Sequence, residues 1–240
     1  MISGIFHQGS GVGNQLFRYI ATRVLAMDKG YEFGMLNPEL SKMSFMNLDL
    51  GIPSRTENVF NEKKVVENGI DIRGYDPEFN FIKDNTLIDG EFQDPRYFEH
   101  RIKEIDEWLK VEPIDIPDDT CVIGFRGGEY VGVYELFLKK DYWDEAIEIM
   151  KEKGIKNFEV HTDDIETATK FFPEYKIIRD VGVNWRSMRY AKHSIISNSS
   201  FYILPRLLSG GVTIAPRYWA RRNIGVWALP SNYYKQFKYI

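Results

Sequence analysis

The sequence predicts an α/β protein built from two Rossmann-like halves with a cleft between them, and three observations lead there. Apolar runs of strand length alternate with patterns of helical period, which is typical of parallel sheets covered by helices. A glycine-rich turn follows the first apolar run. The segment Val111 to Asp119 carries two prolines and four acidic residues in nine positions, which indicates a linker. We therefore expect an N-terminal half over 1–112 and a C-terminal half over 113–240.

The N-terminal half opens with a buried strand over Ile2 to Phe6, followed by HQGSGVGNQ and a helix. Apolar residues of that helix recur at the spacing of one face: Leu16, Tyr19, Ile20, Val24 and Met27. The glycines of the turn either let the backbone approach a ligand or serve a tight turn. The pattern is not GxGxxG, because Asn14 holds the sixth position.

The rest of this half is less regular. Residues 36–86 have poor periodicity, and we expect short helices and loops there. Thr86 to Asp89 predicts a strand. Asp94 and Pro95 form a good helix start, and the helix presents Phe98, Ile102, Ile105 and Leu109 to the core.

The C-terminal half alternates more clearly. CVIGF, FEVHT and YKIIRD predict strands, YWDEAIEIMKEKG and DIETATKFFPEY predict helices, and Met188–Ala191 predicts a short helical piece. The stretch from His193 to Trp219 then predicts a strand over Ser194–Ser197, a polar turn, a helix that opens at Phe201 and a strand over Val212–Ala215.

Composition limits the functional classes. The 240 residues are 43% hydrophobic and carry 31 basic against 35 acidic side chains, net charge −4, which argues against a nucleic-acid partner. Cys121 is the single cysteine, so a disulfide within the chain is excluded and a reducing compartment is expected. The sequence shows no signal-peptide pattern and no apolar run near the roughly 18 residues of a membrane span. We expect a soluble, cytoplasmic protein without a transmembrane segment.

Three polar stretches follow predicted strands of the C-terminal half, where ligands bind in doubly wound folds. Arg126 stands in an open glycine turn, which suits a diphosphate or is a surface arginine. Asp163 and Asp164 either hold a hydroxylated ligand or a metal, or cap the next helix. The turn Asn198–Ser200 caps a helix and offers an anion site. Together they indicate a sugar nucleotide.

Other chemistries lack their motifs. The four histidines show no HExxH spacing, and GxSxG, GxxxxGK[ST] and Asp-x-Asp are not present in the sequence. We therefore expect neither a metal nor another cofactor. The charge of a leaving group would fall to Arg126 and to helix N-termini.

The sequence resembles the α-1,2-fucosyltransferases of glycosyltransferase family 11, nearly from end to end. The family patterns GG-[LI]-GNQ-[LM]-F-x-YA, GYFQS-x-x-YF, HxRRGDY, DYY, SDD, C-K-H-x-I-I-A-N-S-S-F and I-A-P-x-x-W occur in the same order. They correspond to Ser10–Tyr19, Gly90–Phe98, Gly124–Tyr130, Asp141–Trp143, Thr162–Asp164, Ala191–Phe201 and Ile214–Trp219.

The resemblance implies GT-B architecture and metal-independent, inverting transfer of fucose from GDP-fucose to a hydroxyl of a glycan or glycolipid acceptor. Arg126 would contact the β-phosphate, and Glu129 is the candidate general base, with a purely structural role as the alternative. The implied substrate-binding residues are Gly11, Gly13, Asn14, Gln15, Gly128, Tyr130, Asp163, Asp164, Asn184, Asn198, Ser199, Ser200 and Phe201.

Departures from the family patterns leave other functions open. Gly124 and Gly127 replace a histidine and an arginine, and Asn184 replaces an acid that reads the guanine edge; an amide offers a different hydrogen-bonding set from a carboxylate. The family's WWGA is Ile203–Arg206, and at 240 residues the chain is short, which predicts a trimmed acceptor half. The alternatives are transfer from a different nucleotide sugar, or an inactive glycan- or nucleotide-binding module.

A basic cluster near the C-terminus has two interpretations. Arg217, Arg221 and Arg222 stand near Trp219 and Trp227. We favour a solvated basic edge, and the alternative is peripheral contact with a membrane surface or a lipid-linked acceptor.

Overall fold

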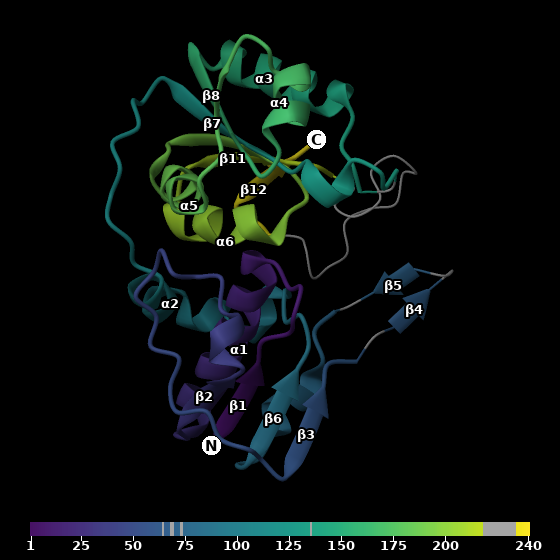
Figure 1. Ribbon diagram of the computed structural model, residues 1–240, viewed down its shortest axis with the longest axis vertical. Coiled ribbons are helices and arrows are strands. Elements are labelled where there is room, and N and C mark those ends of the chain that lie inside the picture. Colours follow the sequence, from purple (N-terminus) through teal and green to yellow (C-terminus); the bar gives the residue numbers. More distant parts are fainter. Residues whose placement is uncertain (64, 68–69, 73, 135, 218–233) are drawn as a thin grey trace. The chain divides into compact units, whose positions relative to one another are not determined.

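The computed structural model describes residues 1–63, 65–67, 70–72, 74–134, 136–217 and 234–240 (Figure 1). The chain divides into two compact units. Unit 1 is Met1–Lys110, and unit 2 holds the described residues of 111–217 and 234–240. The predicted basic cluster falls mostly outside the described residues. No helix among the described residues is long and apolar enough to cross a membrane.

Unit 1 is built on a four-stranded parallel sheet in the order β2-β1-β6-β3. Its strands are β1 (Ile2–Ile5), β2 (Phe33–Leu36), β3 (Asn58–Asn61) and β6 (Thr86–Asp89). The strand β1 is central and pairs with β2 on one side and β6 on the other. The strand that follows β1 in the chain, β2, lies on one side of it, and the later strands β6 and β3 lie on the other. The direction in which strands are added to the sheet therefore reverses between β1 and β6.

Helix α1 (Val12–Lys29) packs on β1 and β2 and ends at Gly30, whose left-handed φ of 67° lets its N–H close the last turn. Most of the helix is buried. The predicted core positions are confirmed except for Met27, which is 44% exposed because it lies in the last turn, beyond the core-facing part of the helix.

Two predictions for unit 1 were wrong. The region 36–86 contains strands as well as short helices: η1 (Pro38–Leu40), β3, an antiparallel β4 (Val65–Glu67) and β5 (Ile70–Ile72) pair, and η2 (Pro77–Phe81). The expected single helix after Asp94 is η3 (Pro95–Tyr97), η4 (Glu99–Arg101) and α2 (Ile102–Trp108). The break is at Phe98, whose φ of −147° and ψ of −12° are not helical, and whose buried ring lies 5.7 Å from the ring of Phe17.

Unit 2 contains a six-stranded parallel sheet in the order β12-β11-β10-β7-β8-β9. Its strands are β7 (Thr120–Phe125), β8 (Asn157–Thr162), β9 (Lys176–Ile178), β10 (His193–Ile196), β11 (Val212–Ala215) and β12 (Phe237–Tyr239). Three strands run outward from β7 in chain order and three run outward from β10. This is the doubly wound Rossmann arrangement, with its switch point between β7 and β10.

Helices cover both faces of this sheet (Figure 1). The helices α3 (Lys140–Glu152) and α4 (Ile165–Phe171) bury one apolar face, which includes Ile123, Phe125 and Val160. The helices α5 (Val181–Tyr190) and α6 (Ser200–Ser209) lie on the other. The helix predicted over Met188–Ala191 is in fact the ten-residue α5. It begins after Asp180, whose carboxylate accepts from the Val183 N–H, and this cap was missed because Asp180 was assigned to the strand YKIIRD.

Candidate functional site

The three polar stretches expected at strand ends of unit 2 follow β10, β7 and β8, which are neighbours in the middle of the sheet. Parallel strands end at the same edge, so the residues after Ile196, Phe125 and Thr162 share one rim. The Ser197 N–H donates to the Gly124 carbonyl at 2.9 Å, which ties the first stretch to the second. The structure therefore brings the three predicted stretches to the switch point, where doubly wound folds bind ligands.

Arg126 is held by two carboxylates. Its Nη1 lies 2.7 Å from Asp163 Oδ2, and its Nη2 donates to Glu129 Oε1 at 2.7 Å. Its guanidinium lies 5.3 Å from the ring centroid of Tyr130. Burial opposes the charge, but Asp163 and then Glu129 outweigh it, and the pKa of Arg126 is raised. The site thus carries a fixed positive charge with a defined orientation.

The two aspartates shape the turn around Arg126. The Gly127 N–H donates to Asp163 Oδ1 at 2.9 Å, and the Gly128 N–H donates to Asp164 Oδ2 at 3.2 Å. Gly128 has φ +47°, and a Cβ there would lie 2.5 Å from Asp163 Oδ2. A Cβ on Gly127 would lie 2.7 Å from Asp164 Cβ. The glycines are therefore required by the close approach of the acids.

Asp164 also caps α4, which was one of the two interpretations of this acid. Its carboxylate accepts from the Thr167 N–H at 3.1 Å and from Thr167 Oγ1 at 2.6 Å. These bonds, the side-chain one first, lower the pKa of Asp164. Contact of Asp163 or Asp164 with a ligand stays a prediction, as does the general-base role of Glu129, whose side chain is 74% exposed.

The Asn198–Ser200 turn begins α6, which starts one residue earlier than predicted, at Ser200. Ser199 occupies the N-cap position, but its side chain makes no capping bond, contrary to the expected cap. The Asn198 Nδ2 donates to the Leu136 carbonyl at 2.9 Å, while Asn198 Oδ1 and Ser197 Oγ are buried and have no hydrogen-bond partner within the part of the chain that the structure describes. An unsatisfied amide oxygen needs a hydrogen-bond donor, such as a hydroxyl, rather than a phosphate oxygen.

Asn184 lies behind this rim, on α5. Its side chain is buried; its Oδ1 lies 2.9 Å from Nδ1 of the buried His161, and its Nδ2 donates to the Thr162 carbonyl at 3.2 Å. The amide therefore fixes the end of β8 to α5. Contact of Asn184 with a nucleobase stays a prediction.

A neighbouring residue on α6 explains why position 124 is a glycine. A Cβ at position 124 would lie 2.8 Å from the ring of Tyr202 and 2.9 Å from Met188. The Tyr202 hydroxyl donates to the carbonyls of His161 at 2.9 Å and Phe125 at 3.3 Å, and Phe201 packs against the Tyr202 ring at 5.2 Å. Tyr202 thus fills the space that a side chain at position 124 would need.

The glycine-rich loop of unit 1 connects β1 to α1. Gly11 is the N-cap of α1 and Gly13 is buried in its first turn. Asn14 Oδ1 accepts from Gln93 Nε2 at 3.2 Å. The Gln15 side chain is fully buried; it donates to the Leu40 carbonyl at 2.8 Å and accepts from the Lys42 N–H at 2.9 Å. Gln15 therefore anchors the segment after β2, and substrate contacts of this loop stay predictions.

Sequence reasoning missed a polar cluster at the carboxyl ends of β1 and β6. The Nε2 of His7 lies 2.8 Å from Asp89 Oδ1, and Arg18 Nη2 donates to Glu91 Oε1 at 2.9 Å. Arg18 Nη1 is 4.0 Å from Asp89 Oδ1. His7 follows one predicted strand and Asp89 ends another, but only the strand order places the two ends side by side.

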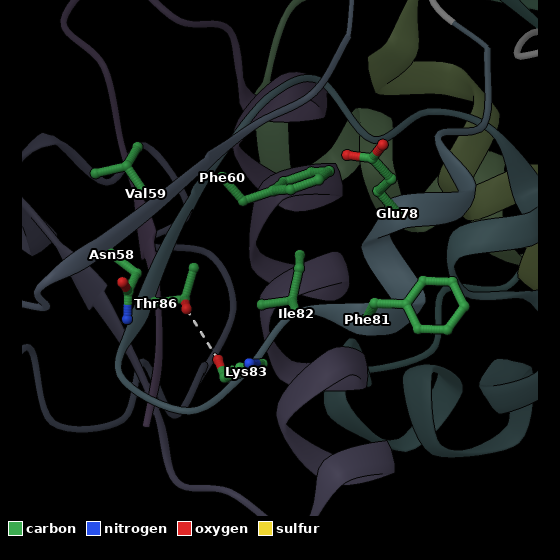
Figure 2. Close-up of a pocket in the computed structure, with 8 residues that line it drawn as sticks. All are labelled: Asn58, Val59, Phe60, Glu78, Phe81, Ile82, Lys83 and Thr86. Carbon is green, nitrogen blue, oxygen red and sulfur yellow. Dashed lines mark hydrogen bonds between the residues drawn. The ribbon is translucent and has the colours of Figure 1, made fainter.

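A hollow of about 380 Å³ lies elsewhere in unit 1 (Figure 2). Thr86 Oγ1 donates to the Lys83 carbonyl there at 2.9 Å, and Phe81 is 78% exposed. Asn58 and Thr86 are the first residues of β3 and β6, so the hollow lies at the amino ends of the strands. It contains none of the predicted site residues.

Comparison with solved structures identifies similar glycosyltransferases. A glycosyl transferase family 9 protein from Veillonella parvula matches with a TM-score of 0.53 at 10% identity, covering 100% of this chain and 85% of that chain. E. coli heptosyltransferase WaaC with ADP-2-deoxy-2-fluoro heptose matches with a TM-score of 0.51 at 10% identity, covering 100% and 93%.

POFUT1 in complex with GDP-fucose matches with a TM-score of 0.43 at 10% identity, over 88% of this chain and 94% of that chain, which is too weak to support an argument. No protein-family model and no curated protein matches the sequence. The predicted α/β, GT-B-like fold is confirmed, and it is a glycosyltransferase fold.

Proposed function

We propose that this protein is an inverting glycosyltransferase that transfers fucose from GDP-fucose to a hydroxyl of a glycan or glycolipid acceptor, forming an α-1,2 linkage without a metal. The observation that carries the proposal is Arg126, oriented by two carboxylates at the switch point of unit 2. The glycosyltransferase fold supports the reaction class. The motifs at Ser10–Tyr19 and Ala191–Phe201 support the fucosyl donor and the linkage.

In this mechanism the bond between the anomeric carbon and the β-phosphate oxygen breaks, and its electron pair leaves with the diphosphate. The N–H groups of Arg126 that do not face Asp163 and Glu129 offer donors to that oxygen, and one preorganised donor of this kind is worth about 3–4 kcal/mol. The start of α6, with Ser199 and Ser200, receives phosphate oxygens. Unit 2 is then the donor side and unit 1 the acceptor side.

A second candidate donor is a nucleotide sugar with a base other than guanine. Asn184 favours it, because an amide offers guanine one acceptor where a carboxylate offers two oxygens, and this amide already bonds His161 and Thr162. The fold and the role of Arg126 are the same in both candidates.

Calorimetry separates the candidates. GDP, UDP, CDP and ADP are titrated into the purified protein with and without EDTA. Tight binding of GDP that EDTA leaves unchanged is the expected result. Preference for another nucleotide would mean that the donor sugar is carried by that nucleotide and not by GDP. If none of the four nucleotides binds, the proposal is contradicted and an inactive module is favoured.

A further inference from the structure

We propose that His7, oriented by Asp89, is the general base that removes the proton from the acceptor hydroxyl, in place of the predicted Glu129. The Glu129 carboxylate accepts from Arg126 Nη2 and then serves to orient that arginine. This inference rests on the proposed function and adds a residue of unit 1 to its machinery. The place of the pair in the fold is the first argument. His7 comes two residues after β1 and Asp89 is the last residue of β6, and the strand order of unit 1 reverses between these two strands.

The hydrogen bond between the two side chains fixes the state of the imidazole. A carboxylate is only an acceptor, so the ring nitrogen 2.8 Å from Asp89 Oδ1, Nε2, carries the proton. Nδ1 then holds a free lone pair, and among the described residues it makes no hydrogen bond. The His7 side chain is 40% exposed, so a hydroxyl can reach it. This is the arrangement of a base held in one tautomer by a third group.

Arg18 places a buried positive charge beside this pair. Its side chain is 9% exposed, yet its Nε and Nη1 have no hydrogen-bond partner in the part of the chain that the structure describes. Nη1 lies 4.0 Å from the carboxylate of Asp89. Buried guanidinium donors are normally satisfied. Neither atom is open to solvent here, so the role of Arg18 beside this pair is electrostatic: its charge lies next to the Asp89 carboxylate that orients His7.

The charges around His7 keep Asp89 available to it. Arg18 is paired with Glu91 at 2.9 Å, and Glu62 Oε2, which follows β3, accepts the N–H groups of Glu91 and Phe92 at 2.7 and 3.1 Å. The facing charged groups are therefore Arg18 from α1, Asp89 from β6, and Glu91 and Glu62 from the loops after β6 and β3.

Proton transfer to His7 occurs together with transfer of the sugar and needs no further reactant. The acceptor oxygen forms a bond to the anomeric carbon while its proton passes to His7 Nδ1. The bond from the anomeric carbon to the β-phosphate oxygen breaks, and its electron pair leaves with the nucleoside diphosphate. His7 becomes an imidazolium ion stabilised by Asp89, and it returns the proton to water after release of the product.

The test compares two histidines of unit 1. His100 Nε2 lies 2.7 Å from Asp28 Oδ2 and its side chain is 48% exposed, so it forms the same kind of pair away from the strand ends. The assay is hydrolysis of GDP-fucose, or of the sugar of whichever nucleotide binds, with water as acceptor. We expect His7→Asn to lower turnover about 10²–10³-fold and leave nucleotide affinity unchanged, and His100→Asn to leave both unchanged.

A pH profile and chemical rescue distinguish a base from a structural residue. The rise of the wild-type rate with pH should be lost in His7→Asn, and added imidazole should restore turnover to His7→Ala. Asp89→Asn should lower kcat about 10-fold or more without raising KM, because the amide no longer dictates the tautomer.

Two outcomes overturn the inference. Wild-type turnover in His7→Asn, with activity lost in a variant of Arg126, refutes the role of His7 and keeps the proposed function. A wild-type protein that neither binds a nucleotide nor hydrolyses its sugar refutes both. His7→Gln repeats the test if the asparagine variant fails to fold.

Discussion

Both units reverse their strand order at the centre of a parallel sheet, yet the two switch points carry different chemistry. In unit 1 the point between β1 and β6 holds a histidine bonded to a carboxylate. In unit 2 the point between β7 and β10 holds Arg126, a permanent cation, beside the start of α6. The topology provides only a rim in each unit. The side chains after each strand decide whether that rim moves protons or holds charge.

The largest expected effect tests the fixed charge of unit 2. Arg126→Ala should lower turnover about 10²–10³-fold, because one preorganised donor contributes about 3–4 kcal/mol to the transition state. Arg179 is the matched control: it also follows a strand of unit 2, the edge strand β9, and lies away from the switch point. Arg179→Ala should retain activity. Steady-state kinetics and circular dichroism check both variants, and unchanged turnover in Arg126→Ala would refute the phosphate role.

The second prediction compares the buried arginines of the two units. Arg206 on α6 is 1% exposed and donates to the carbonyls of Met188, Ala191 and Val212 and to Thr213 Oγ1, so each of its nitrogens is used. Arg206→Met should lower the free energy of unfolding by about 2–4 kcal/mol, because it leaves several buried acceptors without donors.

Arg18→Met should cost only about 1 kcal/mol, because Arg18 has one short hydrogen bond, to the partly exposed Glu91. Urea unfolding measures both variants. Equal losses would mean that Arg18 stabilises the fold as much as Arg206 does, although its Nε and Nη1 have no hydrogen-bond partner among the described residues. A stable Arg206→Met would mean that the desolvation that lowers the pKa of Arg206 to about 10 outweighs its bonds.

The sequence predicted unit 2 better than unit 1 for a physical reason. Strands buried on both faces are continuous apolar runs, as in CVIGF, and their polar ends stand out at once. The strands of unit 1 are short, and β3 is largely exposed on its outer edge, so Asn58–Asn61 has no apolar pattern to reveal it. Local pattern cannot show a strand whose stability comes from its pairing with β6.

The site residues of unit 2 were likewise easier to predict from the sequence than those of unit 1. Arg126, Asp163 and Asn198 are each visible as polar residues after an apolar run, and the structure places all three runs together. The pair of His7 and Asp89 was not predictable, because the two residues are 82 positions apart and adjacent only through the order β1-β6. Burial of Asn184 against His161 also depends on packing that spacing does not encode.

A third, smaller effect tests the packing that shapes the rim of unit 2. Gly124→Ala should lower the free energy of unfolding by about 1–3 kcal/mol, because its Cβ would meet the rigid ring of Tyr202 at 2.8 Å. Gly132 is the control, since a Cβ there has no atom within 4 Å, and Gly132→Ala should leave stability unchanged. Thermal unfolding decides the point. Equal stability of the two variants would show that Tyr202 yields easily and does not define the site.

The smallest effect concerns a third histidine and carboxylate pair, which lies within the sheet of unit 2 and not at a switch point. In unit 2, Glu159 Oε2 lies 3.8 Å from Nε2 of the buried His161, too far for a hydrogen bond, while Oε1 lies 3.0 Å from Lys176 Nζ. The contacts with His161 and then Lys176 lower the pKa of Glu159 to about 2.

A carboxyl whose pKa is lower in the folded state stabilises the fold above its ordinary pKa of 4.5, and this contribution is lost as the pH falls from there toward 2. Glu159→Gln should therefore cost at most about 1 kcal/mol at pH 7, because solvent screens the partly exposed group, and nothing near pH 2. Glu166→Gln, which removes an exposed partner of Lys170, is the control and should show no such pH dependence. Urea unfolding from pH 2 to 7 measures this contribution.

Glu159→Gln should keep full activity, because the Glu159 carboxylate stabilises β8 and takes no part at the rim. Turnover measurements check this. A loss of activity as large as that expected for His7→Asn would mean that position at the switch point does not distinguish the two pairs.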